Sequence, residues 1–239
     1  MEDSSGLLNE TDGFSQFIRI IIAVAVIIFT LVVFTFWQRR KSAKRNILLT
    51  GLCEAGKTYL FNKFVQDKSI PTYTSAKENI GEIKIKDRSL QIIDLPGHER
   101  LRYKFLDKYK TSAVGIVFII DSVTIKNDIR DVTEFLYNLL SDSTIQKVPL
   151  LILCNKQEEK TAKSSDDIKL LLEKEMDLVR VTKSSQLEAT DDTSASFFIG
   201  IQGKDFKFEH LNTEIQFEEL NSNKFNKETL QETFRKIFL

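Results

Sequence analysis

The amino-acid sequence predicts an α/β fold with a mostly parallel six-stranded sheet flanked by helices, preceded by one N-terminal transmembrane helix. After residue 45, short apolar runs bounded by turn-forming residues alternate with stretches of helical periodicity. This order is expected when helices cover both faces of a parallel sheet. Before residue 45, an uncharged run rich in Ile, Val and Phe extends over residues 20–37. A chain of 239 residues, 42% of them hydrophobic, can supply one well-cored domain and such a segment.

The expected elements follow from the apolar patterning. The segments between breakers, in chain order, are Asn46–Thr50, Lys57–Asp67, Asn79–Lys86, Arg88–Ile93, Ala113–Ile120, Thr124–Leu140, Val148–Cys154, Asp166–Leu178, Thr213–Leu220 and Phe225–Leu239. Ala113–Ile120 and Val148–Cys154 are almost continuously apolar, which is typical of central strands buried on both faces. Asn79–Lys86 instead alternates in polarity, which favours an edge strand.

The N-terminal run predicts a membrane span. As a helix, residues 20–37 would cover about 27 Å, enough for a thin bilayer such as that of the endoplasmic reticulum. The alternatives are a buried core helix and a cleaved signal peptide, but the acidic residues before the run and the basic residues after it argue against cleavage. The basic flank comprises Arg39, Arg40, Lys41, Lys44 and Arg45 and places the following chain in the cytosol.

The expected organisation is therefore a lumenal tail (1–18), a transmembrane helix (19–37), a basic linker (38–45) and a cytosolic domain (46–239). Asn9 begins a glycosylation sequon in the tail, but it lies so close to the membrane that we do not expect it to be glycosylated. Lys and Arg number 34, as do Asp and Glu, so no overall field favours polyanions and we expect no direct nucleic-acid binding. Cys53 and Cys154 are expected to stay reduced.

A phosphate-binding loop is the most specific motif. Gly51–Thr58 reads G-x-x-x-x-G-K-T and stands between an expected strand and an expected helix. Its backbone N–H groups and the helix N-terminus would surround phosphates. Lys57 would neutralise the β- and γ-phosphates, and the Thr58 hydroxyl would ligate Mg²⁺.

A second motif, Asp94–Glu99, comes directly after the strand Arg88–Ile93 and so lies at the same edge of the sheet. Asp94 would hold Mg²⁺ through water, the Gly97 amide would meet the γ-phosphate, and His98 is the candidate for orienting an attacking water molecule. Between the two motifs, Thr74 is expected to close over the γ-phosphate and Mg²⁺, the alternative being an ordinary turn threonine.

The third motif, Asn155-Lys156-Gln157-Glu158, also comes after a buried strand and resembles the N-K-x-D sequence with which GTPases recognise guanine. Glu158 is one methylene longer than the usual aspartate, and guanine is the base that we expect the motif to recognise. Ser222-Asn223-Lys224 loosely resembles the S-A-K element on the base side.

The polar stretch Lys183–Ser196 predicts a mobile loop, and together with the residues after it forms an expected insertion at about 183–210. Phe197–Gly200 and Phe206–Phe208 are expected to add an extended segment. A solvated surface insertion is the favoured interpretation, and a binding element is the alternative.

Taken in order, these motifs resemble those of Ras/Arf-type small GTPases, and the resemblance implies a P-loop GTPase domain. Within that superfamily, Gly-Leu-x-x-x-Gly-Lys-Thr-x-Leu-Phe, Asp-Leu-Pro-Gly-His-Glu, Thr-x-Thr-Ser and the N-terminal span are similar to the beta-subunit family of signal recognition particle receptors. On this basis the nucleotide-binding residues are Gly51, Glu54, Ala55, Gly56, Lys57, Thr58, Thr74, Gly97, Asn155, Lys156, Glu158, Ser222 and Asn223. The magnesium residues are Thr58, Thr74 and, through water, Asp94.

The resemblance implies GTP and Mg²⁺ as cofactors, weak intrinsic hydrolysis, and residence in the endoplasmic reticulum membrane with the N-terminus lumenal. It also implies recruitment of the receptor alpha subunit in the GTP state for co-translational protein targeting, with the translocon or ribosome as further partners. Two alternatives remain open. One is a membrane scaffold stabilised by permanently bound nucleotide, without GTP/GDP switching. The other is an ATP-dependent membrane enzyme.

Overall fold

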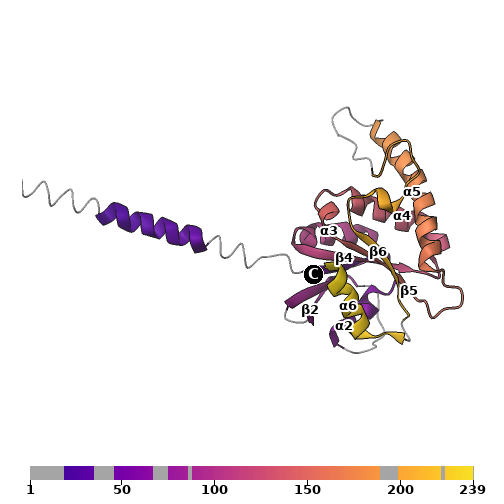
Figure 1. Cartoon of the computed structure of the whole chain (residues 1–239), viewed down its shortest axis with the longest axis horizontal. Coiled ribbons are helices and arrows are strands. Elements are labelled where there is room, and N and C mark those ends of the chain that lie inside the picture. The colour runs from indigo at the N-terminus through magenta and orange to yellow at the C-terminus, as the bar shows by residue number, and fades with distance from the viewer. Residues whose placement is uncertain are drawn as a thin grey trace, which may run out of the picture. The chain divides into compact units, whose positions relative to one another are not determined.

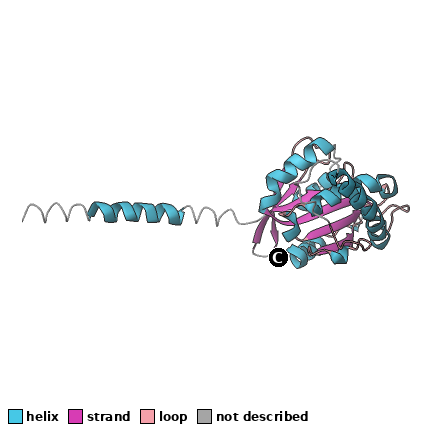
Figure 2. Cartoon of the chain, turned by 90° about the horizontal axis from the view of Figure 1, so that it is seen from above, coloured by secondary structure: helices cyan, strands magenta, loops and turns pink. Residues whose placement is uncertain are grey.

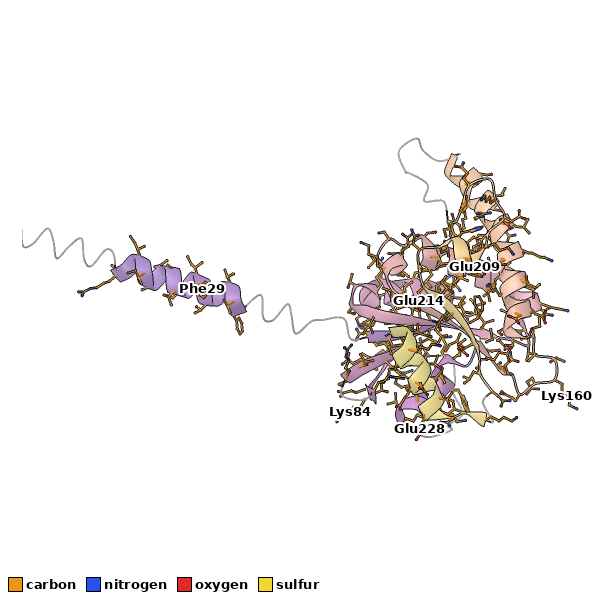
Figure 3. All side chains as sticks on the ribbon, in the orientation of Figure 1. Phe29, Lys84, Lys160, Glu209, Glu214 and Glu228 are labelled. Atoms are coloured by element: carbon orange, nitrogen blue, oxygen red, sulfur yellow. The ribbon has the colours of Figure 1, made fainter. Side chains whose placement is uncertain are left out.

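The computed structural model describes residues 19–34, 46–66, 75–85, 88–188, 199–221 and 224–238, and the chain divides into two units, Met1–Ala43 and Lys44–Leu239. In the first unit, residues 19–34 form a helix (Figure 1). Its large apolar side chains are exposed, Phe29 by 68% (Figure 3). Among the residues described, no helix combines the length and apolar composition needed to cross a membrane. Residues 35–37 of the expected span lie outside the described ranges.

The second unit is built on one six-stranded sheet. The strands are β1 (Asn46–Thr50), β2 (Asn79–Ile85), β3 (Arg88–Asp94), β4 (Ala113–Asp121), β5 (Leu150–Asn155) and β6 (Ile215–Glu219). They lie in the order β2-β3-β1-β4-β5-β6, and every neighbouring pair is parallel except β2 and β3. The predicted mostly parallel sheet, with β2 as an edge strand, is confirmed.

Helices cover both faces of this sheet (Figure 2). They are α2 (Lys57–Gln66), α3 (Glu99–Tyr109), α4 (Ile125–Ser141), α5 (Ser165–Glu188) and α6 (Lys227–Phe238), with short 3-10 turns η1 (Lys110–Ser112), η2 (Ile145–Lys147) and η3 (Phe208–His210). Side chains of α2 and α6 belong to one core cluster, and those of α3, α4 and α5 to another. The sheet is thus buried on both faces, as its continuous apolar strands predict.

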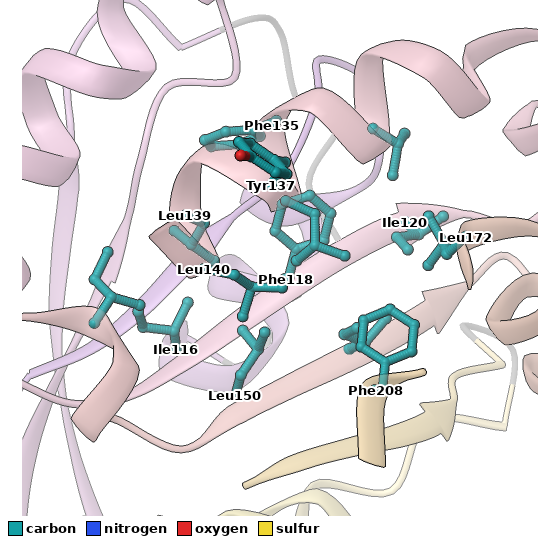
Figure 4. Close-up of a cluster of buried hydrophobic side chains, with 14 of the residues drawn as sticks. Ile116, Phe118, Ile120, Phe135, Tyr137, Leu139, Leu140, Leu150, Leu172 and Phe208 are labelled. Carbon is teal, nitrogen blue, oxygen red and sulfur yellow. The ribbon is translucent and has the colours of Figure 1, made fainter. Parts of the chain in front are cut away.

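The two cores follow from the two-residue period of the strands. Along β4, Ile116 and Phe118 enter the cluster under α4, whereas Val117 and Ile119 enter the opposite one. Phe118 packs on Phe135 of α4 with ring centroids 5.3 Å apart (Figure 4). Full burial of each such side chain stabilises the fold by about 1.5–3 kcal/mol. The strands are therefore fixed from both sides, which holds their carboxyl ends in place.

Helix α3 was not expected from the sequence. Its residues are mostly charged, and only Arg102 and Leu106 are buried, so the helical period of apolar residues is too weak to detect. The helix begins where the His98 side chain accepts a hydrogen bond from the backbone N–H of Arg100. Such an N-cap satisfies a backbone donor that the first helical turn leaves unpaired.

The insertion differs from the prediction at both ends. Helix α5 extends through Glu188, so the first part of the expected loop, residues 183–188, is helical. No strand includes residues 199–210. Phe206 and Phe208 are buried in the core instead, and Phe208 opens the turn η3. Residues 189–198 lie outside the described ranges.

Buried polar contacts attach the described part of this insertion to α5. Asp177 accepts a hydrogen bond from the backbone N–H of Phe206 at 2.9 Å. Arg180 donates to the carbonyl oxygens of Ile199 at 3.2 Å and Lys204 at 2.9 Å. The expectation of a solvated surface insertion is therefore wrong for Ile199, Phe206 and Phe208, which are buried, whereas residues 201–205 are exposed.

Candidate nucleotide-binding site

The predicted motifs converge at one edge of the sheet. The phosphate loop comes after β1, the Asp94 motif after β3, and the Asn155 motif after β5. Because these three strands are parallel, their carboxyl ends face the same side, where ligands bind in open α/β sheets.

The phosphate loop is braced by the third motif. The Asn155 side chain, only 2% exposed, donates a hydrogen bond to the Ala55 carbonyl oxygen at 2.9 Å. Gly56 has a φ of 95°, and a Cβ atom there would lie 2.2 Å from Asn155 Nδ2. Only glycine accommodates both this backbone conformation and this close approach. The sequence motif predicts that Asn155 lies near the nucleotide base, and the structure adds its contact with the phosphate loop.

Lys57 occupies the position of the phosphate-neutralising lysine. Its side chain is buried, and Nζ donates to the Leu52 carbonyl oxygen across the loop. Burial lowers the pKa of Lys57, whereas the nearby Asp94 carboxylate acts in the opposite direction. The ammonium group has three donors, so hydrogen-bonding capacity remains for phosphate oxygens.

A carboxylate and a hydroxyl meet next to Lys57. Thr58 Oγ1 donates to Asp94 Oδ2 at 2.7 Å, and Asn79 Nδ2 donates to the same oxygen at 2.9 Å. Asp94 is fully buried, and burial raises its pKa, which the Asn79 and Thr58 hydrogen bonds oppose. Its other oxygen, Oδ1, is buried without a hydrogen-bond partner among the described residues.

These groups fit a magnesium ion held together with phosphates. Mg²⁺ prefers oxygen ligands and usually keeps several waters, so one hydroxyl and one water-linked carboxylate suffice beside a nucleotide. The orphaned Asp94 Oδ1 can accept a hydrogen bond from such a water. Within the described ranges, no cluster of three or more His, Cys, Asp and Glu side chains forms a metal site made of protein alone.

Gly97 lies against the phosphate loop. A Cβ atom at this position would be 2.6 Å from Lys57 Nζ and 2.7 Å from the backbone nitrogen of Cys53. The close approach of the two loops therefore requires glycine. The next residue, His98, is exposed and caps α3, so the imidazole lies at the rim of the site rather than inside it.

The third motif also holds a charged pair. Lys156 has a φ of 65°, and its ammonium group lies 2.6 Å from Asp121 Oδ2 at the end of β4. Gln157 donates from its side chain to Ser122 Oγ at 3.0 Å and to the Lys163 carbonyl at 2.8 Å. These contacts give the motif a fixed conformation between two neighbouring strand ends.

The base-side elements are brought together by the backbone. The N–H group of Gln157 donates to the Leu220 carbonyl oxygen at 3.1 Å, so the end of β6 lies beside the third motif. Glu158 is half-buried here. Ser222 and Asn223, which come shortly after this contact, lie outside the described residues and stay predictions.

Thr74 is likewise outside the described residues, but its neighbour Ser75 is within them. Ser75 Oγ lies 3.2 Å from Thr58 Oγ1. The loop that carries Thr74 thus rejoins the described chain next to the proposed magnesium ligand, and the role assigned to Thr74 remains a prediction.

Sequence reasoning missed Asn79 and Asp121. Asn79 opens β2 and is paired with Asp94 in the antiparallel register. Asp121 ends β4 opposite Asn155 of β5. Both are polar residues at strand ends on the ligand side, a signal visible in the sequence once the sheet register is known.

Comparisons with known proteins identify the family. A family model described as signal recognition particle receptor beta subunit matches residues 42–215. The signal recognition particle receptor subunit beta of Rattus norvegicus is 39% identical over 211 residues, covering 86% of this chain and 78% of that protein.

Solved structures agree with this assignment. A chain in the structure of the mammalian SRP receptor superposes with a TM-score of 0.72 at 36% identity, covering 80% of this chain and 99% of that chain. The SRb-GTP/SRX complex from Chaetomium thermophilum gives a TM-score of 0.58 at 21% identity, with 75% and 91% covered. This second likeness concerns the fold alone, which is the α/β P-loop GTPase fold. On the family model and the rat relative together, the chain belongs to the family of signal recognition particle receptor beta subunits.

Proposed function

We propose that this chain is the membrane-anchored GTP-binding subunit of a signal recognition particle receptor. In the GTP state it recruits the alpha subunit to the endoplasmic reticulum, where ribosomes carrying nascent secretory chains reach the translocon. Family membership supports this role. The single observation that supports nucleotide binding most strongly is the convergence of buried Lys57, Thr58 and buried Asp94 beside the glycine loop.

Each group has a distinct task toward the nucleotide. Lys57 and the loop N–H groups neutralise the phosphates, and Thr58, Thr74 and water-linked Asp94 hold Mg²⁺, which shields the phosphate charge when bound. The Gly97 amide faces the γ-phosphate. Loss of the γ-phosphate would remove this hydrogen bond and so change what the segment after β3 can bind.

Guanine is the proposed base. Glu158 accepts from the ring N1–H and the exocyclic amine, and Lys156, held by Asp121, packs along the base. A site that pairs a carboxylate with two N–H donors of the base discriminates strongly against a base that does not offer them, because both hydrogen bonds to the base are then lost. Adenine offers no N1–H donor, so we expect GTP to be preferred to ATP.

The N-terminal helix is the proposed anchor. Its exposed large apolar side chains are between 49% and 68% accessible, a pattern suited to lipid rather than to water. With residues 35–37 included, the predicted span reaches Trp37 and the basic linker. Attachment would then be independent of the nucleotide, which would control only the recruitment of partners.

Intrinsic hydrolysis is proposed to be weak. His98 replaces the glutamine that orients water in many GTPases, and it lies exposed at the rim while its Nδ1 accepts from Arg100 at 3.3 Å. Binding of GTP, rather than turnover, is the property on which recruitment rests.

The test is a nucleotide competition with the full chain in detergent. We expect fluorescent GTP to be displaced by unlabelled GTP but not by ATP at the same concentration. Lys57→Ala should weaken GTP binding at least about 100-fold, since the buried cation is lost. Lys84→Ala is the matched control, because it removes the same charge from the exposed side of β2 (Figure 3). Equal displacement by both nucleotides, or retained affinity in Lys57→Ala, would contradict the proposal.

A further inference from the structure

We propose that Asn79 is a positioning residue for Asp94, the proposed magnesium-holding carboxylate, which it orients. The inference rests on the proposed nucleotide site. It concerns a side chain that none of the nucleotide-binding motifs contains.

The first contact is with Asp94. Asn79 Nδ2 donates to Asp94 Oδ2 at 2.9 Å, beside the hydrogen bond from Thr58 at 2.7 Å. Two donors on one oxygen fix the rotation of the carboxylate and leave Oδ1, buried and without a partner among the described residues, directed elsewhere. That oxygen is the one available to a magnesium-bound water. Asn79, together with Thr58, would therefore keep Oδ1 available for such a water.

The second contact is with Ser75. The same amide nitrogen lies 3.4 Å from Ser75 Oγ, which in turn is 3.2 Å from Thr58 Oγ1. An amide NH₂ group has two N–H donors, so one can reach Asp94 while the other reaches Ser75. Ser75 directly follows Thr74. The Asn79 side chain thus connects Ser75 to the Asp94 carboxylate.

The backbone fixes Asn79 in this place. Asn79 is the first residue of β2 and pairs with Asp94, the last residue of β3. The preceding residue, Glu78, points to α3, where its carboxylate accepts from Lys108 at 2.6 Å and from the Tyr109 hydroxyl at 2.9 Å. Anchored on both sides, Asn79 has little freedom to leave the carboxylate.

Partners that orient a metal ligand typically change metal affinity by about 10–100-fold when they are removed. An amide suits this role because it is neutral, so it donates to the carboxylate without competing for its negative charge as a lysine would. Loss of the amide would leave Asp94 held by Thr58 alone, the hydroxyl that must also ligate the ion.

The experiment measures the release of fluorescent GDP from the full chain in detergent at increasing free Mg²⁺. We expect Asn79→Ala and Asn79→Leu to raise the Mg²⁺ concentration for half-maximal slowing of release by about 10–100-fold. Release in EDTA should match that of the unsubstituted chain. The leucine variant keeps the branched shape of the side chain without its amide and guards against a packing defect in the alanine variant.

Asn46→Ala is the matched control. Asn46 opens β1 and donates to Ser112 Oγ at 2.7 Å, at the opposite end of the sheet. Its removal should leave the Mg²⁺ dependence unchanged. An unchanged half-maximal Mg²⁺ concentration in the Asn79 variants would overturn the proposal, and so would equal acceleration of release with and without Mg²⁺, which indicates a structural role. Failure of the unsubstituted chain to bind GDP would instead overturn the proposed function.

Discussion

At the scale of single residues, Asn155 connects two motifs that are 100 positions apart. The sequence motif predicts contact with the base, and the structure adds a buried hydrogen bond to the phosphate loop. The phosphate loop, Asp94 and the Asn155 motif were predictable because their spacing after strands is specific. The contacts between them were not, since they depend on how the loops pack. Asn79 was missed for the same reason.

The bond from Asn155 to the loop predicts a loss of both stability and binding in Asn155→Ala. The Ala55 carbonyl would remain buried without its donor, which costs about 1–3 kcal/mol of unfolding free energy. GTP affinity should fall at least about 10-fold, as measured by fluorescent nucleotide titration and thermal unfolding.

Asn138→Ala serves as its control, because Asn138 makes a similar bond to the Tyr103 hydroxyl at 2.9 Å between α3 and α4. That substitution should leave GTP affinity unchanged. An Asn155→Ala variant that binds GTP normally would show that the hydrogen bond from Asn155 to the Ala55 carbonyl is not needed for nucleotide binding by the phosphate loop.

At the scale of elements, the strands were more predictable than the helices. The central strands β4 and β5 were recognisable as almost continuously apolar runs, and β2 by its alternation. Helix α3 is too polar for its helical period to be recognised in the sequence. Helix α5 extends into a stretch rich in Ser and Thr, where Lys183 pairs with Glu134 of α4 at 2.9 Å. The insertion packs through Phe206 and Phe208, whose burial no local pattern revealed.

Helix α3 is joined to the start of β2 through Glu78, and this contact predicts a pH effect. The hydrogen bond from Lys108, assisted by Tyr109, lowers the pKa of Glu78 from 4.5 to about 2. A depressed carboxyl pKa stabilises the folded state above the unfolded pKa, and this stability is lost as the pH falls toward the folded value. The contribution is therefore full above about pH 5 and declines between 4.5 and 2.

Glu78→Gln should lower the unfolding free energy by about 1 kcal/mol at pH 7, because Lys108 is largely exposed and the pair is screened by water. The difference from the unsubstituted chain should shrink as denaturant titrations are repeated from about pH 5 to about pH 3. Glu159→Gln, at an exposed position, is the control. A difference that stays constant over this range would contradict the assigned pKa shift.

At the scale of the whole molecule, the chain joins a P-loop GTPase fold to an apolar N-terminal helix in a separate unit. The sheet and the ligand edge were predictable from sequence because alternation of strands and helices constrains the topology strongly. The partner was predicted only through the resemblance to a known family, since recognition depends on surface shape rather than on motif spacing. Family membership is what connects this fold to a receptor.

The proposed switch requires that GTP, and not GDP, prepares the chain to bind the receptor alpha subunit. The decisive quantity is the affinity of the purified alpha subunit for the full chain in detergent, loaded with a non-hydrolysable GTP analogue, with GDP, or with no nucleotide. We expect binding at least about 10-fold tighter in the GTP-analogue state, a coupling in the usual range for a switch. Equal affinity in the GTP-analogue and GDP states would refute switching and identify the nucleotide as a structural ligand of a scaffold.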